Sequence, residues 1–244
     1  MKTHALLLTL CLAPIALMAL PSRAHAADVI DHGAFDTLLS KYVDGQGRVA
    51  YAKLHASKED RATLDQYVDQ IGAASLEGAS SKAAKAYYIN AYNALVIDAV
   101  VDRWPVQSVM KVDGFFKEIK HKVAGRAMTL DALENTVIRP TYKDARVHFV
   151  LVCAAKSCPR LQKKALTEKN VDKVMGAATK EFVNKATSVE GAKVTTSQLF
   201  NWFKDDFVRD EGSVRAYLAK YSTKALPKEG EITFSEYDWA INKR

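Results

Sequence analysis

Apolar residues recur at helical spacing along most of the chain. The strongest pattern lies in residues 81–104, SKAAKAYYINAYNALVIDAVVDRW, which are rich in alanine and leucine and are followed by Pro105. Because this segment is apolar nearly all round, it predicts a central helix that is buried on every side. The aromatic residues expected in the core are Tyr87, Tyr88, Tyr92, Trp202, Phe203, Tyr237 and Trp239.

Shorter patterns predict more helix than strand. Amphipathic spacing predicts helices at 31–43, 58–74, 130–140, 167–186 and 213–222, and a strand followed by a helix at 192–207. Strand patterns lie at 48–54 (a short strand or an extended arm), 123–129 (a hairpin turning at Gly125), 145–153 (a buried strand) and 230–242. Thr129 is expected to cap the helix 130–140 and Pro140 to end it. Without βαβ alternation, the fold class is α+β: a helix-rich single domain with a small antiparallel sheet.

The N-terminus has the pattern of an export signal. Lys2 precedes the apolar run ALLLTLCLAPIALMAL, and the segment ends in the small-residue pattern Ala24-His25-Ala26. We therefore expect a signal peptide at 1–26, one domain at 27–244 and a periplasmic or secreted location. A membrane anchor is the alternative, but the run is shorter than the about 20 residues that span a bilayer and is broken by Pro14.

The charge distribution disfavours nucleic acid as a partner. The net charge of +7 falls to +5 without residues 1–26, because that segment contains Lys2 and Arg23 and no acidic residue. The remaining lysines are interspersed with acids, as on an ordinary solvated surface. We expect no nucleic-acid partner, no stable membrane insertion and no cofactor, and the sequence does not define the oligomeric state.

Candidate chemistry is concentrated in HFVLVCAAKSCPRL, which runs from His148 to Leu161 and contains Cys153 and Cys158. Three interpretations of the cysteines stay open: a disulfide, a thiolate nucleophile, or for Cys153 a small apolar residue at the end of a core strand. A metal site is disfavoured because C-x4-C with one upstream histidine is not a structural zinc pattern.

A straight strand would separate His148 from Cys153. Five residues at about 3.3 Å each span about 16 Å, and an odd offset directs the two side chains to opposite faces. Cys158 is therefore the favoured nucleophile and Cys153 the second candidate, with His148 as general base. Lys156 and Ser157, in the loop between the cysteines, are candidate binding residues, and Lys156 could also support a thiolate.

Three further polar residues lie on predicted helices. Glu134 lies near an apolar helix face, where it could orient the imidazole of His148 or pair with Arg139 or Arg146. Asn90 and Asn93 lie three residues apart on the buried helix. They could hold loop backbone in place or, less commonly, bind the substrate by donating to an oxyanion.

Five motifs, in this order, resemble the DUF547 family: AYYINAYNALVIDAV, MTLDALENTVIRP, ARVHFVLVCAAKSCPRL, LFNWFKDDF and FSEYDWAIN. The resemblance covers roughly residues 30–242. It implies an α+β core similar to papain- and transglutaminase-type cysteine enzymes, with cysteine, histidine and glutamate as candidate site residues. One position departs from the family pattern, since the usual I-E-H reads Leu133-Glu134-Asn135.

These observations favour an exported thiol-dependent hydrolase or acyl transferase with Cys158 or Cys153 as nucleophile, His148 as base and Glu134 as its orienting group. Its substrate would be a peptide or a small amide or ester. The alternative is a non-catalytic binding or structural domain with a Cys153–Cys158 disulfide. A thiol-redox protein is disfavoured because the C-x-x-C spacing is absent.

Overall fold

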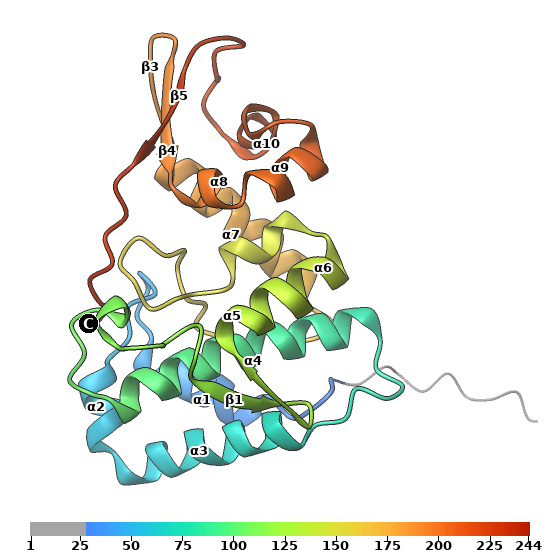
Figure 1. The fold of residues 1–244 in the computed structure, drawn as a ribbon, viewed down its shortest axis with the longest axis vertical. Helices are drawn as coiled ribbons and strands as arrows, with labels where there is room; N and C mark the ends of the chain where they lie inside the picture. The colour runs from blue at the N-terminus through green and yellow to red at the C-terminus, as the bar shows by residue number, and fades with distance from the viewer. Residues whose placement is uncertain (1–27) are drawn as a thin grey trace, which may run out of the picture.

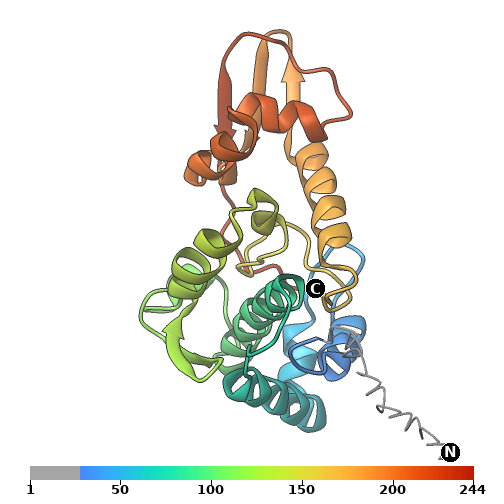
Figure 2. The same ribbon diagram turned by 90° about the vertical axis from the view of Figure 1, so that its right-hand side faces the viewer.

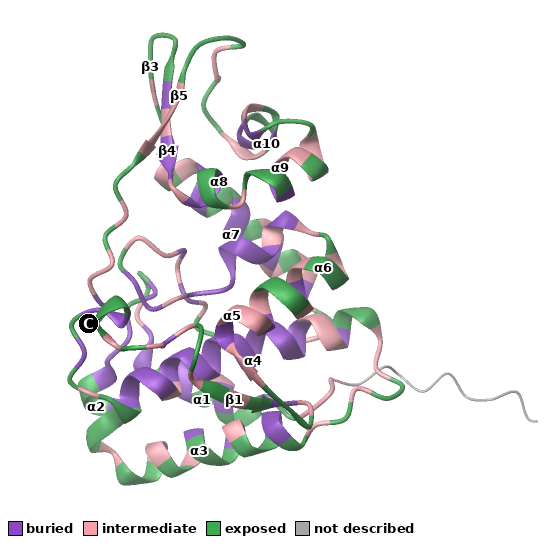
Figure 3. Ribbon diagram, in the orientation of Figure 1, coloured by how far each residue is buried: buried purple, intermediate pink, exposed green. Residues whose placement is uncertain are grey.

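The long helix α4 (Ser81–Asp102) lies at the centre of the computed structural model, which describes residues 28–244. It begins where the Ser80 hydroxyl accepts a hydrogen bond from the Ala83 N–H. Its buried residues lie on every side of the helix, as the apolar pattern predicts (Figure 3). Tyr87, Tyr88 and Tyr92 are all in the core, which confirms that part of the prediction. The predicted signal peptide and its cleavage site lie outside the described residues.

Helices predominate around α4, with two small sheets, so the helix-rich α+β fold class is confirmed. The helices of the described residues are α1 (Gly33–Tyr42), α2 (Tyr51–Ala56), α3 (Lys58–Ala73), η1 (Val109–Lys111), α5 (Leu130–Ala132), η2 (Leu133–Ile138), α6 (Arg139–Tyr142), η3 (Ala145–Phe149), α7 (Val171–Ala186), α8 (Leu199–Trp202), α9 (Lys204–Glu211) and α10 (Val214–Tyr221). Among these residues, no helix combines the length and the apolar character needed to cross a membrane.

The two sheets are separate. The strands β1 (Lys120–Val123) and β2 (Arg126–Thr129) form the predicted antiparallel hairpin, whose turn includes Gly125 at a φ of 76°. The second sheet has the order β3-β4-β5, in which β3 (Ser188–Glu190) is antiparallel and β5 (Ile232–Ser235) parallel to β4 (Lys193–Ser197). The described residues thus contain a mixed sheet besides the antiparallel one that was predicted.

The elements form two parts, with the site segment between them. In Figure 1, α1 to α4 and β1 lie in the lower part, and the second sheet with α8 to α10 lies in the upper part. The long helix α7 connects the two parts, as the turned view in Figure 2 makes clear. After β5 the chain returns to the lower part and ends near α2, where Lys243 pairs with Val49.

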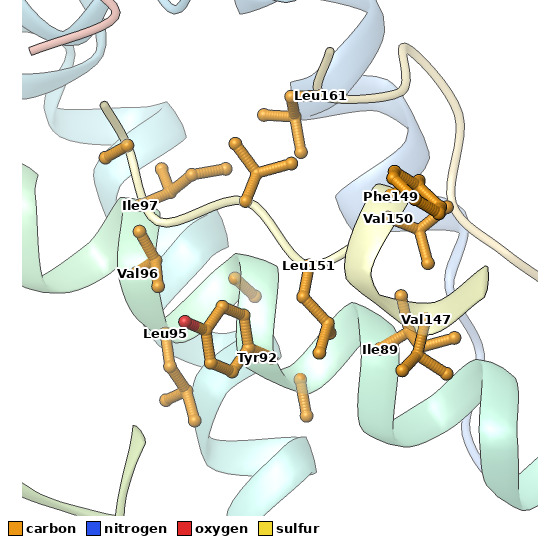
Figure 4. Packing of buried hydrophobic residues seen from close by; sticks show 14 of the residues in the cluster. Ile89, Tyr92, Leu95, Val96, Ile97, Val147, Phe149, Val150, Leu151 and Leu161 are labelled. Atoms are coloured by element: carbon orange, nitrogen blue, oxygen red, sulfur yellow. The ribbon is translucent and has the colours of Figure 1, made fainter. Parts of the chain in front are cut away.

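The prediction of a strand at 145–153 is wrong. Residues 145–149 form the 3-10 helix η3, which begins where the Asp144 carboxylate accepts from the Arg146 N–H, and the following residues run as a buried irregular segment. A side chain, instead of a neighbouring strand, satisfies two of its backbone polar groups: Asn93 of α4 bonds the Val150 carbonyl and the Val152 N–H. Figure 4 shows this segment packed against α4. A short continuous apolar run does not distinguish these structures, because it lacks a period.

Two smaller predictions also need correction. Residues 48–54 do not form a strand, since α2 begins at Tyr51. Thr129 does cap the next helix, with its hydroxyl accepting from the Ala132 N–H, but Pro140 does not end it. The chain continues helically through the π-helix η2 and α6, and Lys143 ends it in the left-handed region with a φ of 44°. Pro140 lies in the first turn of α6, directly after the π-helix.

Candidate active site

The segment between the two cysteines doubles back on itself. Ala154 has a φ of 64°, in the left-handed region that costs a residue with a Cβ roughly 1–2 kcal/mol. The turn brings the Cα atoms of Cys153 and Cys158 to 6.4 Å, and the two residues form a disulfide. Of the three interpretations of the cysteines, the structure therefore contains the disulfide. An extended chain over the same five residues would span about 16 Å.

The C-terminal segment holds this loop in place. The Lys156 N–H donates to the Ala240 carbonyl at 2.8 Å, and the Ser157 hydroxyl accepts from the Asp238 N–H at 2.8 Å. This pairing places the Tyr237 hydroxyl 3.3 Å from Cys158 Sγ and 3.4 Å from Cys153 Sγ.

Cys158 Sγ has a second donor. The Cys153 backbone N–H donates to it at 3.1 Å, so that sulfur lies within reach of two hydrogen-bond donors. Apart from the disulfide, Cys153 Sγ has one side-chain hydrogen-bond partner among the described residues, the Tyr237 hydroxyl.

His148 is fixed in orientation by its neighbours. Its side chain is 1% exposed and its ring stacks on Phe203 at 4.0 Å between centroids. Nε2 lies 2.7 Å from Asp206 Oδ2, whereas Nδ1 has no hydrogen-bond partner in the part of the chain that the structure describes. Burial lowers the pKa of His148, although Asp206 opposes that effect.

Asp206, on α9, sets the tautomer of His148. Burial raises the pKa of Asp206, but hydrogen bonds from His148 and Arg139 outweigh it and hold that pKa below its usual value. Arg139 Nε lies 2.7 Å and Arg209 Nη1 2.8 Å from its carboxylate oxygens. An ionised carboxylate only accepts hydrogen bonds, so His148 Nε2 carries the proton. Nδ1 then presents a lone pair, as a general base requires.

Glu134 approaches His148 from the other side. It lies in η2, and π-helical turns of this kind occur frequently at functional sites. Its Oε1 lies 3.9 Å from His148 Nδ1, too far for a hydrogen bond. Burial raises the pKa of Glu134 to about 7, against the lowering influence of the Tyr92 hydroxyl and Arg139.

The predicted catalytic residues share one cavity of about 170 Å³. It is lined by Glu134, His148, Cys153 and Cys158, together with Tyr92, Phe116, Asp131, Asn135, Leu151, Pro159, Leu199, Trp202, Phe203, Tyr237 and Trp239. The structure thus brings together the four residues that sequence reasoning named as catalytic.

The predicted binding residues are elsewhere. Lys156 and Ser157 line a neighbouring cavity of about 250 Å³, which shares Cys158 and Tyr237 with the first. Lys156 is exposed, 3.8 Å from the Asp238 carboxylate. Neither residue lines the cavity that contains His148.

Asn90 and Asn93 both hold loop backbone. Asn90 bonds the carbonyl and the N–H of Leu166 at 2.7 and 2.9 Å. Asn93 bonds the Val150 carbonyl at 2.8 Å and the Val152 N–H at 2.9 Å. Since the amide and the carbonyl group of each side chain are engaged with backbone, the structure gives both asparagines the first of their two predicted roles.

Sequence reasoning missed Asp206 and Tyr237. Asp206 lies between Phe203 and Phe207, and an acid among residues of an apolar helix face was the signal that could have found it. Tyr237 was assigned to the core. Trp202 was assigned to the core as well, and that prediction is wrong: it is 47% exposed at the cavity.

Residues 76–183 match the family model described as "Protein of unknown function, DUF547". Over these residues the chain is similar to the DUF547 family. The match includes the motifs that supply Asn93, Glu134, His148 and both cysteines. The motifs with Asp206 and Tyr237 lie beyond it, so the resemblance over residues 30–242 was wider than the match. No curated protein and no solved structure matches the chain. The implied likeness to papain- and transglutaminase-type enzymes stays a prediction.

No group of three or more histidine, cysteine, aspartate or glutamate side chains between residues 28 and 244 is placed to hold a metal ion.

Proposed function

We propose that this chain is an exported thiol-dependent hydrolase or acyl transferase that acts on an amide or ester. One observation carries the proposal: the Asp206–His148 hydrogen bond leaves the Nδ1 lone pair at a cavity that both cysteines also line. A nucleophile, a base and a group that orients the base form the arrangement used in nucleophilic acyl transfer. Asp206 takes the orienting role that Glu134 was expected to have.

Cys158 is the proposed nucleophile. Its sulfur lies 3.1 Å from the Cys153 N–H and 3.3 Å from the Tyr237 hydroxyl, and both donors would stabilise a thiolate. The earlier reason for choosing Cys158, the offset along a strand, does not apply because the segment is not a strand.

The disulfide must be reduced before this chemistry begins. An external dithiol would exchange with the Cys153–Cys158 bond, becoming a disulfide itself while both cysteines become thiols. His148 then takes the Cys158 proton, and the thiolate attacks the carbonyl carbon to form a thioester. The imidazolium returns the proton to the departing amine or alcohol. Water or a second nucleophile, activated by His148, releases the acyl group and regenerates the thiol.

Trapping of the thioester tests the proposal. The reduced protein is mixed with an activated acetyl ester, and its intact mass is followed after acid quenching. We expect a gain of one acetyl group in the wild type and in Cys153→Ser, and none in Cys158→Ser. His148→Ala should slow the gain by about 10²-fold or more, because general base catalysis contributes at least that much. Equal acetylation in all four proteins would overturn it.

The disulfide itself favours a second candidate function. In that account the chain is a non-catalytic binding domain, and the Cys153–Cys158 bond serves to hold the loop against the C-terminal segment. Alkylation separates the two. If the reduced cysteines react no faster than free cysteine and no acyl-enzyme forms, the binding domain is the better account.

A further inference from the structure

Three aromatic rings form one wall of the cavity that contains His148. Trp202 lies 4.9 Å from Tyr237 and 5.8 Å from Trp239, and the last two lie 4.6 Å apart, all between ring centroids. Exposing nearly half of a tryptophan to water is unfavourable, and exposed aromatic groups of this kind mark binding sites. In residues 28–244 Met110 is the other large hydrophobic residue that is exposed, and it does not line the cavity.

Besides His148, the cysteines and the Asn135 amide, the rest of the cavity lining is aromatic, apolar or acidic. Tyr92, Phe116 and Phe203 bring the aromatic rings to six, and Asp131 and Glu134 contribute carboxyl groups. No lysine or arginine is among the lining residues. The Asp131 carboxylate accepts a hydrogen bond from the neutral amide of Asn135 at 3.1 Å. Between residues 28 and 244, no lysine or arginine nitrogen lies within 4 Å of either carboxyl group.

This combination fits a cation better than other small groups. The faces of aromatic rings carry negative electrostatic potential and attract ammonium groups, and tryptophan does so most strongly. An anion would be repelled by the Asp131 carboxylate, and an uncharged apolar group would bury both carboxyl groups without compensation. The volume of about 170 Å³ is below the ~300–1,000 Å³ of drug-sized sites, so one small group fills it.

We propose that this cavity binds an alkylammonium group, held by the faces of Trp202, Tyr237 and Trp239 and by the Asp131 carboxylate, with the Glu134 carboxyl group also at the cavity wall. The inference rests on the proposed function in one respect: if the cavity is the substrate site, the amide or ester substrate carries an alkylammonium group. Binding itself does not require a free thiol, so it can be measured on the disulfide form.

A pair of isosteric probes tests the charge directly. Choline and 3,3-dimethylbutan-1-ol have the same shape and differ in whether the branched atom is a cationic nitrogen or a neutral carbon. Each is titrated into the intact oxidised protein, and tryptophan fluorescence and ligand NMR line widths report binding. We expect choline to bind at least about tenfold more tightly than the alcohol. Equal affinities, or no binding of either, would overturn the proposal.

Substitutions at the cavity wall test whether choline binds there. Trp202→Ala should weaken choline binding by about tenfold, and Trp202→Phe, which keeps a ring, should weaken it less. Asp131→Asn should weaken choline binding and leave the binding of the alcohol unchanged. Met110→Ala removes the exposed apolar side chain outside the cavity and should change neither the affinity for choline nor that for the alcohol. An unchanged choline affinity in Trp202→Ala would contradict the proposal, as would a loss in Met110→Ala.

The outcome is separable from that of the proposed function. If choline binds selectively but the reduced protein forms no acyl-enzyme, the ammonium site stands and the acyl-transfer proposal fails. If the acyl-enzyme forms and the cavity does not distinguish the two probes, the acyl-transfer proposal stands and the ammonium site is wrong.

Discussion

The asparagines of α4 and the His148 cluster are both buried and polar, but their hydrogen bonding differs. Asn90 and Asn93 each donate to a backbone carbonyl and accept from a backbone N–H. His148 has a strong bond to Asp206 at Nε2 and none at Nδ1 in the described part of the chain. Glu134, beside that nitrogen, has its pKa raised to about 7 by burial.

The difference separates structural from functional polar residues. A fully paired buried amide stabilises the native backbone and has no remaining group to offer to a ligand. A buried nitrogen without a partner is costly, and such costs are characteristic of sites that bind or react with something else. The four predictions that follow test this contrast.

Asp206→Asn should have the largest effect. The carboxylate that holds His148, Arg139 and Arg209 would become neutral. Arg209 keeps its ion pair with Asp210, but His148 and Arg139 lose this charged partner, which should cost about 3 kcal/mol or more in the free energy of unfolding. Because the folded-state pKa of Asp206 is lowered, this stability is present above its unfolded pKa near 3.8 and is lost as the pH falls further. Urea unfolding at pH 7 and at low pH measures it.

Asp205→Asn is the matched control, since Asp205 is the exposed neighbour on the same helix. It should change the free energy of unfolding by less than about 0.5 kcal/mol. Equal effects of the two substitutions would show that Asp206 has no special role.

Glu134→Gln should raise the free energy of unfolding above neutral pH, whereas Asp206→Asn should lower it. The pKa of Glu134 is about 7 in the folded state and 4.5 in the unfolded state. Between pH 4.5 and pH 7 the native wild type therefore binds more protons than the unfolded chain. The wild type therefore loses stability, on the order of 3 kcal/mol, as the pH rises from 4.5 to 7. The variant should be about equally stable at pH 4 and more stable than the wild type at pH 8.

Glu229→Gln, at an exposed position, should keep the wild-type pH profile. Thermal unfolding across the pH range compares the three proteins. If Glu134→Gln follows the same profile as the wild type, Glu134 does not titrate in the way described here.

Asn93→Ala tests the structural side of the contrast, with a smaller effect. It removes the bonds to Val150 and Val152 and should lower the free energy of unfolding by about 2 kcal/mol, through the unpaired backbone groups. Asn201→Ala, on the surface, should cost less than about 0.5 kcal/mol. Denaturant unfolding without any loss in Asn93→Ala would show that the amide is not needed to hold the segment.

The sequence predicted elements whose pattern has a clear period or a strong end signal. The α4 segment is apolar on all sides over six turns, and Gly125 and Thr129 mark a turn and a cap. The segment from residue 145 to residue 153 has no such period. Two of its backbone groups pair with Asn93, which is remote in sequence. The apolar run therefore suggested a strand where η3 lies.

The candidate site was predicted only in part, because some of its residues are brought together by long-range packing. His148, Glu134 and the cysteines were named from residue types and proximity in sequence. Asp206 was missed because which of Asp205 and Asp206 faces His148 depends on how α9 packs, and the apolar neighbours Phe203 and Phe207 were the one local signal in favour of Asp206. Tyr237 and Trp202 are aromatic residues whose position at a cavity follows from the return of the C-terminal segment, a long-range contact without a local signal.

The central claim is that His148, oriented by Asp206, supports a thiolate at Cys158. The most direct test is the pH dependence of alkylation of Cys158 in the Cys153→Ser background, which has one cysteine in the described residues and no disulfide. We expect a thiol pKa below about 7 with His148 present and near 8.5 in the same background carrying His148→Ala. A pKa near 8.5 in both proteins would contradict the account.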